Sequence, residues 1–207
     1  MKKIMFNDKY GLTQAVLEGR KTMTRRIITA PRRKIDGKDV CGFAVYKTHE
    51  GIPYEVWLTG PDEESLCQLL PTYHIGEEVA IAQCYRELYE KREIFFQSKA
   101  SLELYKSLAG WNNKMFVRSD RNVMPNRIHI TNVKYERLRD ISSEDCLKEG
   151  IEARVTGCHT FYYIHGEDKA YNFPKQAFSA LIDKVSGKGT WQRNPWVFVY
   201  EFELLNS

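Results

Sequence analysis

The segment that most constrains the fold lies near the end of the sequence and runs from Trp196 to Leu204. It is strongly apolar and rich in β-branched and aromatic residues, which favour a strand. Further strands are predicted at 40–49, 54–59, 79–85, 94–96 and 127–138, and helices at 6–18, 98–108, 142–150 and 173–185. Because these elements do not alternate regularly, they predict an α+β fold with a curled, mostly antiparallel sheet. Residues 61–70 are predicted to be a turn or short helix, and residues 152–172 a long loop.

The length and the cysteines limit the class of protein. A chain of 207 residues fits one domain, or one domain with a large insertion, and a hydrophobic content of 43% is enough for a core. The five cysteines are scattered and include no Cys-x-x-Cys pair, which favours reduced thiols and a cytoplasmic location. No segment is as apolar and long as a membrane span. Cys158, His159 and His165 match no zinc spacing, so neither a metal nor a cofactor is predicted.

Positive charge is concentrated in one segment, residues 20–34, which holds seven Lys or Arg and no Asp or Glu. The whole chain has 31 basic and 27 acidic residues, so the rest of it is net acidic, with 24 against 27. A local excess of this kind predicts an anionic partner on one face. Guanidinium groups and hydroxyls in this segment are suited to phosphate oxygens. The candidate nucleic-acid contacts are Arg20, Thr22, Arg25, Arg26, Arg32 and Arg33. The alternative is a solvated basic turn whose arginines pair with surface acids.

The same segment also contains the parts of a nucleophilic site. A Thr hydroxyl is a weak nucleophile unless a base or a cation helps it to ionise. Lys21 lies three residues before Thr24, close enough to assist it in a turn. No carboxylate lies nearby in the sequence to direct the proton.

Four separated pieces resemble ASCH domains, which are relatives of the PUA RNA-binding fold. Residues 19–26, Gly-Arg-Lys-Thr-Met-Thr-Arg-Arg, are similar to the signature turn of that family. Residues 75–81 resemble its Gly-Glu strand start, residues 135–151 its strand and short acidic helix, and residues 191–199 the ending of longer phage and bacterial members. The resemblance implies one PUA-like domain over residues 1–207, a β-barrel with flanking short helices. It also implies insertions at about 40–70 and 86–126.

The resemblance implies two functions. One is binding of RNA or of a nucleotide or nucleoside in a basic cleft, and Trp111 and Tyr162 are candidates for base stacking. The alternative is amide hydrolysis, because some short bacterial relatives remove the acetyl group from acetylated cytidine. Their catalytic positions correspond to Lys21, Thr24 and Glu149, with Thr24 as nucleophile. Binding is the first expectation and catalysis the second, and the sequence leaves the oligomeric state open.

Overall fold

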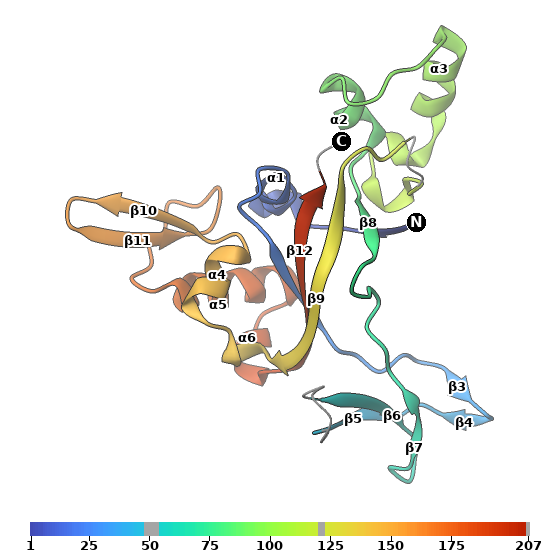
Figure 1. Cartoon of the computed structure of the whole chain (residues 1–207), viewed down its shortest axis with the longest axis vertical. Helices are drawn as coiled ribbons and strands as arrows, with labels where there is room; N and C mark the ends of the chain where they lie inside the picture. The colour runs from blue at the N-terminus through green and yellow to red at the C-terminus, as the bar shows by residue number, and fades with distance from the viewer. Residues whose placement is uncertain (48–53, 120–122, 206–207) are drawn as a thin grey trace.

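A five-stranded sheet forms the centre of the computed structural model, which describes residues 1–47, 54–119 and 123–205 (Figure 1). Its strands are β1 (Lys2–Ile4), β2 (Met23–Ile27), β8 (Glu78–Ile81), β9 (Arg127–Arg137) and β12 (Trp196–Leu205). They lie in the order β1-β8-β9-β12-β2, and only β1 and β8 are parallel neighbours. The predicted apolar strand is therefore β12, which pairs with β9 on one side and β2 on the other.

Burial explains why β12 is so apolar. Val197, Val199 and Phe202 are buried in the main core, together with Ile128 and Ile130 of β9. The α+β class and the mostly antiparallel pairing are confirmed. Among the described residues the sheet is open, with β1 and β2 as its edge strands, and no closed barrel is formed.

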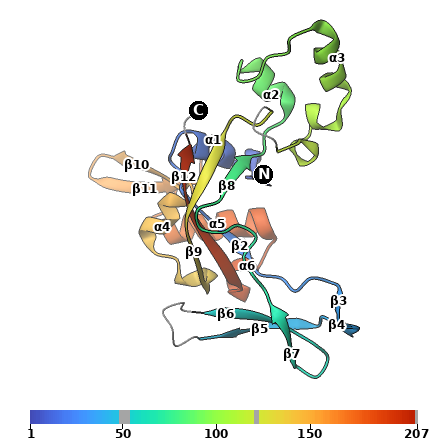
Figure 2. The same ribbon diagram turned by 45° about the vertical axis from the view of Figure 1, so that its right-hand side comes forward.

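Helices accompany the sheet on the side of β2 (Figures 1 and 2). They are α1 (Leu12–Leu17), α4 (Ser143–Lys148), α5 (Pro174–Ser186) and α6 (Thr190–Arg193). Helix α4 contacts both β2 and α5, and the Ser142 hydroxyl caps it by accepting a hydrogen bond from the Asp145 N–H at 3.0 Å. The helix predicted at 6–18 is divided into η1 (Asp8–Tyr10) and α1. Gly11 separates them with φ +60°, and a Cβ at this position would lie 2.4 Å from the His165 ring.

The two segments identified as insertions form substructures at opposite ends of the central sheet (Figures 1 and 2). The first contains the antiparallel strands β5 (Gly42–Tyr46), β6 (Glu55–Thr59) and β7 (Ser65–Gln68), preceded by the hairpin of β3 (Lys34–Ile35) and β4 (Lys38–Asp39). The second contains α2 (Tyr85–Glu90), α3 (Lys99–Ser107), η2 (Ala109–Trp111) and η3 (Lys114–Phe116). A separate hydrophobic cluster that includes Tyr85, Leu88 and Val117 holds the second segment together. Residues 48–53 and 120–122 of these segments lie outside the described residues.

Four sequence-based predictions of local structure were wrong. Residues 61–70 contain strand β7. Residues 94–96 form no strand, because Ile94 packs into the second cluster and the segment pairs with none of the described strands. The strand predicted at 79–85 ends at Ile81, and Tyr85 begins α2. The loop predicted at 152–172 contains a hairpin of β10 (Glu152–Thr156) and β11 (His159–Tyr163), whose turn has Gly157 at φ +63°.

Candidate active site

The chain between α1 and β2 places the candidate nucleophile. Gly19, at φ +71°, lies just after α1, and the Lys21 N–H then donates to the Ala15 carbonyl at 2.9 Å. Thr22 is held through its backbone, because its N–H donates to the Lys148 carbonyl of α4 and its carbonyl accepts from Phe202 of β12. Strand β2 starts at Met23 and places Thr24 opposite Tyr200 of β12. The basic turn is therefore fixed to three elements rather than extending into solvent.

Lys21 and Glu149 form a buried ion pair. The side chains are 2% and 6% exposed, and Lys21 Nζ lies 2.6 Å from Glu149 Oε2. The same nitrogen also donates to the carbonyl oxygens of Glu149 and Met23, each at 2.8 Å. Glu149 caps the C-terminus of α4, where a carboxylate is unfavourable beside the negative end of the helix. The ammonium group of Lys21 offsets both the carboxylate and the backbone carbonyl of this cap residue.

Arg25 holds the other oxygen of the Glu149 carboxylate. Its Nη1 donates to Glu149 Oε1 at 3.1 Å, its Nε to Glu136 Oε1 at 2.8 Å, and its Nη2 to Asp145 Oδ2 at 3.1 Å. The Arg25 side chain is only 1% exposed. Three carboxylates therefore occupy this guanidinium, and its burial argues against the predicted role of Arg25 as a phosphate contact. Its position instead fixes the orientation of Glu149.

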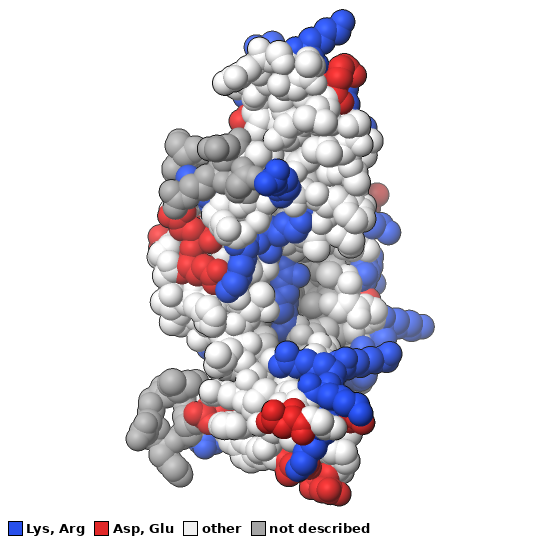
Figure 3. All heavy atoms as spheres, turned by 90° about the vertical axis from the view of Figure 1, so that its right-hand side faces the viewer, with Lys and Arg blue, Asp and Glu red and all other residues white. Residues whose placement is uncertain are grey.

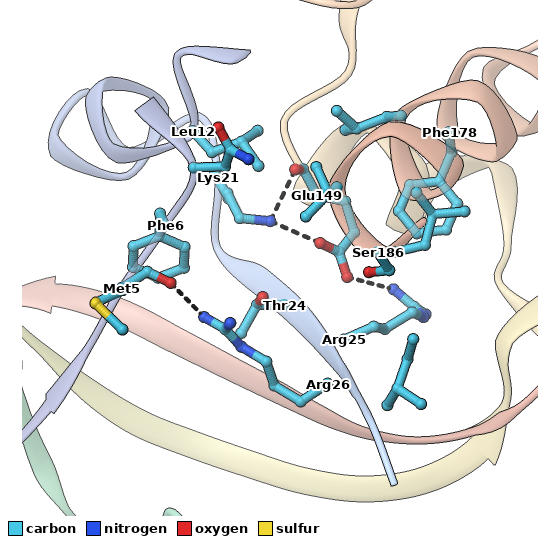
Figure 4. Close-up of a pocket in the computed structure, with 15 residues that line it drawn as sticks. Met5, Phe6, Leu12, Lys21, Thr24, Arg25, Arg26, Glu149, Phe178 and Ser186 are labelled. Carbon is cyan, nitrogen blue, oxygen red and sulfur yellow. Dashed lines mark hydrogen bonds and ion pairs between the residues drawn. The ribbon is translucent and has the colours of Figure 1, made fainter. Parts of the chain in front are cut away.

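Lys21, Thr24 and Glu149 line one cavity of about 260 Å³. Figure 4 shows the Thr24 hydroxyl on the same side of β2 as the Lys21 amine and the Glu149 carboxylate. None of the hydrogen bonds drawn in Figure 4 involves Thr24, so its hydroxyl is not engaged by the other residues that line the cavity. Phe6 and Leu12 form one apolar wall, and Phe178 of α5 belongs to another. None of the described residues in the segments 40–70 and 86–126 lines this cavity.

Burial controls the protonation of Lys21. Removal from water lowers the pKa of its ammonium group, and the attraction of the Glu149 carboxylate opposes this effect without cancelling it. A lowered pKa makes it easier for Lys21 to pass a proton to Glu149, and the neutral amine formed in this way is the species that can accept a proton from a neighbouring hydroxyl. The pair can therefore act as a proton relay beside Thr24.

The other predicted nucleic-acid contacts are dispersed. Arg20 pairs with Glu18 at 2.6 Å on the surface, as in the alternative of a basic turn paired with surface acids. Arg32 and Arg33 are exposed. Arg26 lines the cavity and donates from Nη2 to the Met5 carbonyl at 2.6 Å, whereas its Nε is buried without a hydrogen-bond partner. The proposed stacking residue Trp111 packs against Tyr89, with ring centroids 6.0 Å apart, and Tyr162 packs against the main core.

Sequence reasoning missed two kinds of residue at this site. The first is the pair of acids that hold Arg25, namely Glu136 on β9 and Asp145 in α4. The second is the α5 wall, formed by Phe178, Leu181, Ile182, Val185 and Ser186. The apolar stripe of α5 indicates a helix with one face packed on the core, but it does not indicate that part of this face lines a cavity.

No family model, curated protein or solved structure matches this chain. The resemblance to ASCH domains therefore remains a prediction. No group of three or more His, Cys, Asp or Glu among the described residues is placed to hold a metal ion. No helix in the described part of the chain has both the length and the apolar character needed to cross a bilayer.

Proposed function

We propose that the protein hydrolyses a small amide, of the acylated-nucleoside type that the ASCH resemblance suggests, with Thr24 as the nucleophile. The observation that carries this proposal is the buried Lys21–Glu149 pair in the same cavity as the Thr24 hydroxyl. A buried ion pair is weak evidence for stability, because desolvation offsets most of its attraction. Its position beside an unengaged hydroxyl is better explained by catalysis.

The reaction has two steps. Thr24 Oγ1 attacks the amide carbonyl of the substrate, while its proton passes to Lys21 and a proton of Lys21 passes to Glu149. The pair then returns the proton to the leaving nitrogen, which departs as an amine and leaves an acyl ester on Thr24. Water attacks this ester, the same pair accepts the proton of the water and returns one to Thr24 Oγ1, and the carboxylic acid is released.

The size of the cavity favours a small substrate. Its volume of about 260 Å³ lies below the range of about 300–1,000 Å³ that is typical of drug-sized ligands. Apolar side chains from the segment before η1, from α1 and from α5 surround the polar group, which limits water and strengthens the electrostatic interactions within it. These features suit a substrate made of an acyl group attached to a single ring better than they suit a nucleic-acid strand.

The test is release of acetate from acetylated cytidine by the native protein and by matched threonine variants. Thr24→Ala is expected to abolish turnover, and Lys21→Ala and Glu149→Gln to be nearly as damaging, because residues that act as a unit are not additive. Thr22→Ala is the control, since Thr22 is held through its backbone and does not line the cavity. Native protein without turnover would exclude this substrate, and equal turnover in the native and Thr24→Ala proteins would exclude Thr24 as nucleophile.

Binding of a single-stranded nucleic acid is a second candidate, supported by the exposed Arg32 and Arg33, which follow β2 in the chain. Affinity for a short RNA should then fall steeply with salt, because binding releases counterions from each phosphate. The double variant Arg32→Gln/Arg33→Gln should flatten this salt dependence. A salt slope that the double variant leaves unchanged would exclude these two arginines as the contacts.

A further inference from the structure

A second cavity adjoins the candidate active site. It has a volume of about 310 Å³ and shares Met5, Arg26 and Ile27 with the first cavity. Tyr73, Phe198 and Tyr200 also line it. On the face turned toward the viewer in Figure 3, Lys and Arg side chains lie on the floor and along the edges of a hollow across the middle of the molecule. A ligand that reaches Thr24 therefore has a second space beyond Arg26.

The charge of the second cavity differs from that of the first. Lys3 and Arg26 line it together with Thr29 and Thr72, and none of the described lining residues is Asp or Glu. The nearby carboxylate of Glu77, whose charge contributes to the raised pKa of Tyr73, is already paired with Lys2 at 2.9 Å. In the first cavity, by contrast, Glu149 pairs with Lys21 and with Arg25. An uncompensated pair of cations with adjacent hydroxyls favours an anionic group.

Arg26 lines both cavities, and most of its N–H donors make no hydrogen bond within the described residues. Among the described residues its guanidinium makes one hydrogen bond, from Nη2 to the Met5 carbonyl, and the buried Nε has no partner. A guanidinium has five N–H donors, and a buried donor without an acceptor is costly. Lys3 donates to the carbonyls of Met115 and Val117, and its third donor has no partner in the part of the chain that the structure describes. Both cations can therefore accept a ligand without losing their own contacts.

We infer that the second cavity is a phosphate subsite, so that the substrate is an acylated nucleotide rather than a free nucleoside. This inference rests on the proposed function. The acylated base occupies the cavity of Thr24, and the phosphate attached to the ribose lies beyond Arg26, where Arg26 and Lys3 bind it. Guanidinium groups suit phosphate oxygens because planar N–H donors match their geometry.

The test compares the binding of reaction products, so that it does not depend on turnover. The affinities of cytidine, cytidine 5′-monophosphate and a short cytidine oligonucleotide are measured by calorimetry for native protein, Arg26→Gln and Arg154→Gln. Native protein is expected to bind the monophosphate about tenfold more tightly than the nucleoside, as one charged hydrogen bond allows. Arg26→Gln should lose this preference, whereas Arg154→Gln, which removes an exposed arginine of the β10–β11 hairpin, should keep it.

Several outcomes would overturn the inference. Equal affinity of the native protein for nucleoside and monophosphate, or no binding of the monophosphate, would exclude the subsite, even if acetylated cytidine is hydrolysed. An oligonucleotide that binds more tightly than the monophosphate would assign the cavity to a phosphodiester strand. If Arg26→Gln lowers turnover equally for acetylated cytidine and its monophosphate, Arg26 acts at the acyl carbonyl instead. If Arg26→Gln fails to fold, the ratio of the affinities of native protein for the monophosphate and for the nucleoside still decides whether the subsite exists. Arg26→Lys, which keeps the charge, should retain part of the preference for the monophosphate.

Discussion

Lys21 Nζ contacts Glu149 twice, at 2.6 Å through the carboxylate oxygen Oε2 and at 2.8 Å through the backbone carbonyl, although the two residues are 128 positions apart. One ammonium group thus neutralises a buried carboxylate and satisfies the carbonyl of the residue that caps α4. This double contact joins the α1–β2 turn to the end of α4 and fixes the position of the candidate proton relay.

Removal of one partner of this pair should be strongly destabilising. Lys21→Met leaves the Glu149 carboxylate buried with Arg25 as its remaining cation, and the loss of a partner from a buried pair costs about 3–5 kcal/mol. The measurement is the free energy of unfolding in urea. The double variant Lys21→Met/Glu149→Leu should lose less than the sum of the two single variants. A cost below about 1 kcal/mol, the range of exposed pairs, would contradict the buried pair.

Gly150→Ala should disturb the site as well as the fold. Gly150 has φ +102°, and a Cβ there would lie 3.1 Å from Leu12 Cδ2 and 3.6 Å from Lys21 Cδ. We expect a loss of about 1–3 kcal/mol from backbone strain, together with a fall in activity because Leu12 and the stem of Lys21 must shift. Gly157→Ala is the matched control, since φ is +63° there and no atom lies within 4 Å of the added Cβ. Similar activity in the two variants would show that the contact with Lys21 does not matter.

The parts of the site that could be predicted depend on local signals. The start of the Gly-x-Lys-Thr turn is fixed by hydrogen bonds from Gly19 and Lys21 to the carbonyls of α1 just before it. The Ser142 cap and the acidic first turn of α4 are likewise formed by residues that are neighbours in the sequence. The resemblance to ASCH domains also grouped Lys21, Thr24 and Glu149, and the three residues line one cavity. The apolar strand at 196–204 was confirmed as β12 because its hydrophobic pattern is strong and continuous.

The parts that could not be predicted depend on contacts between distant residues. Arg25 looks like an exposed phosphate contact in a basic run, and its burial follows from Glu136 and Asp145, which lie 111 and 120 positions away. The sequence predicts a loop at 152–172 and misses the hairpin at 152–163, because none of the residues in its two short strands is buried and only the first strand alternates between polar and apolar residues. Packing also decided that α5, rather than either insertion, forms a wall of the cavity.

Arg25→Lys should lower catalysis by releasing Glu149 from its fixed orientation. A lysine ammonium is a single point charge and does not reproduce the three separate donations that Arg25 makes to Glu136, Asp145 and Glu149. We expect kcat to fall by about 10- to 100-fold, as for small misplacements of catalytic groups, with KM little changed because Arg25 is not expected to contact the substrate. The measurement is steady-state hydrolysis, with the exposed variant Arg20→Lys as control. A rise in KM with unchanged kcat would instead assign Arg25 to substrate binding.

Alkaline stability should depend on the Cys146 thiol in α4. Burial raises the pKa of this thiol from 9.0 to about 12. Above pH 9.0 the unfolded chain loses this proton while the folded protein keeps it, so the folded state binds more protons and its stability falls as the pH rises. The contribution is fully present below that pH and is lost progressively as the pH rises toward about 12. Cys146→Val removes the titrating group, so its free energy of unfolding should decline less steeply than that of native protein. The lowered pKa of Lys21 acts in the opposite direction in both proteins and cancels in the comparison. The measurement is the free energy of unfolding of both proteins in urea at a series of pH values. If the two plots of this free energy against pH are parallel, the fold does not protect the thiol from ionisation.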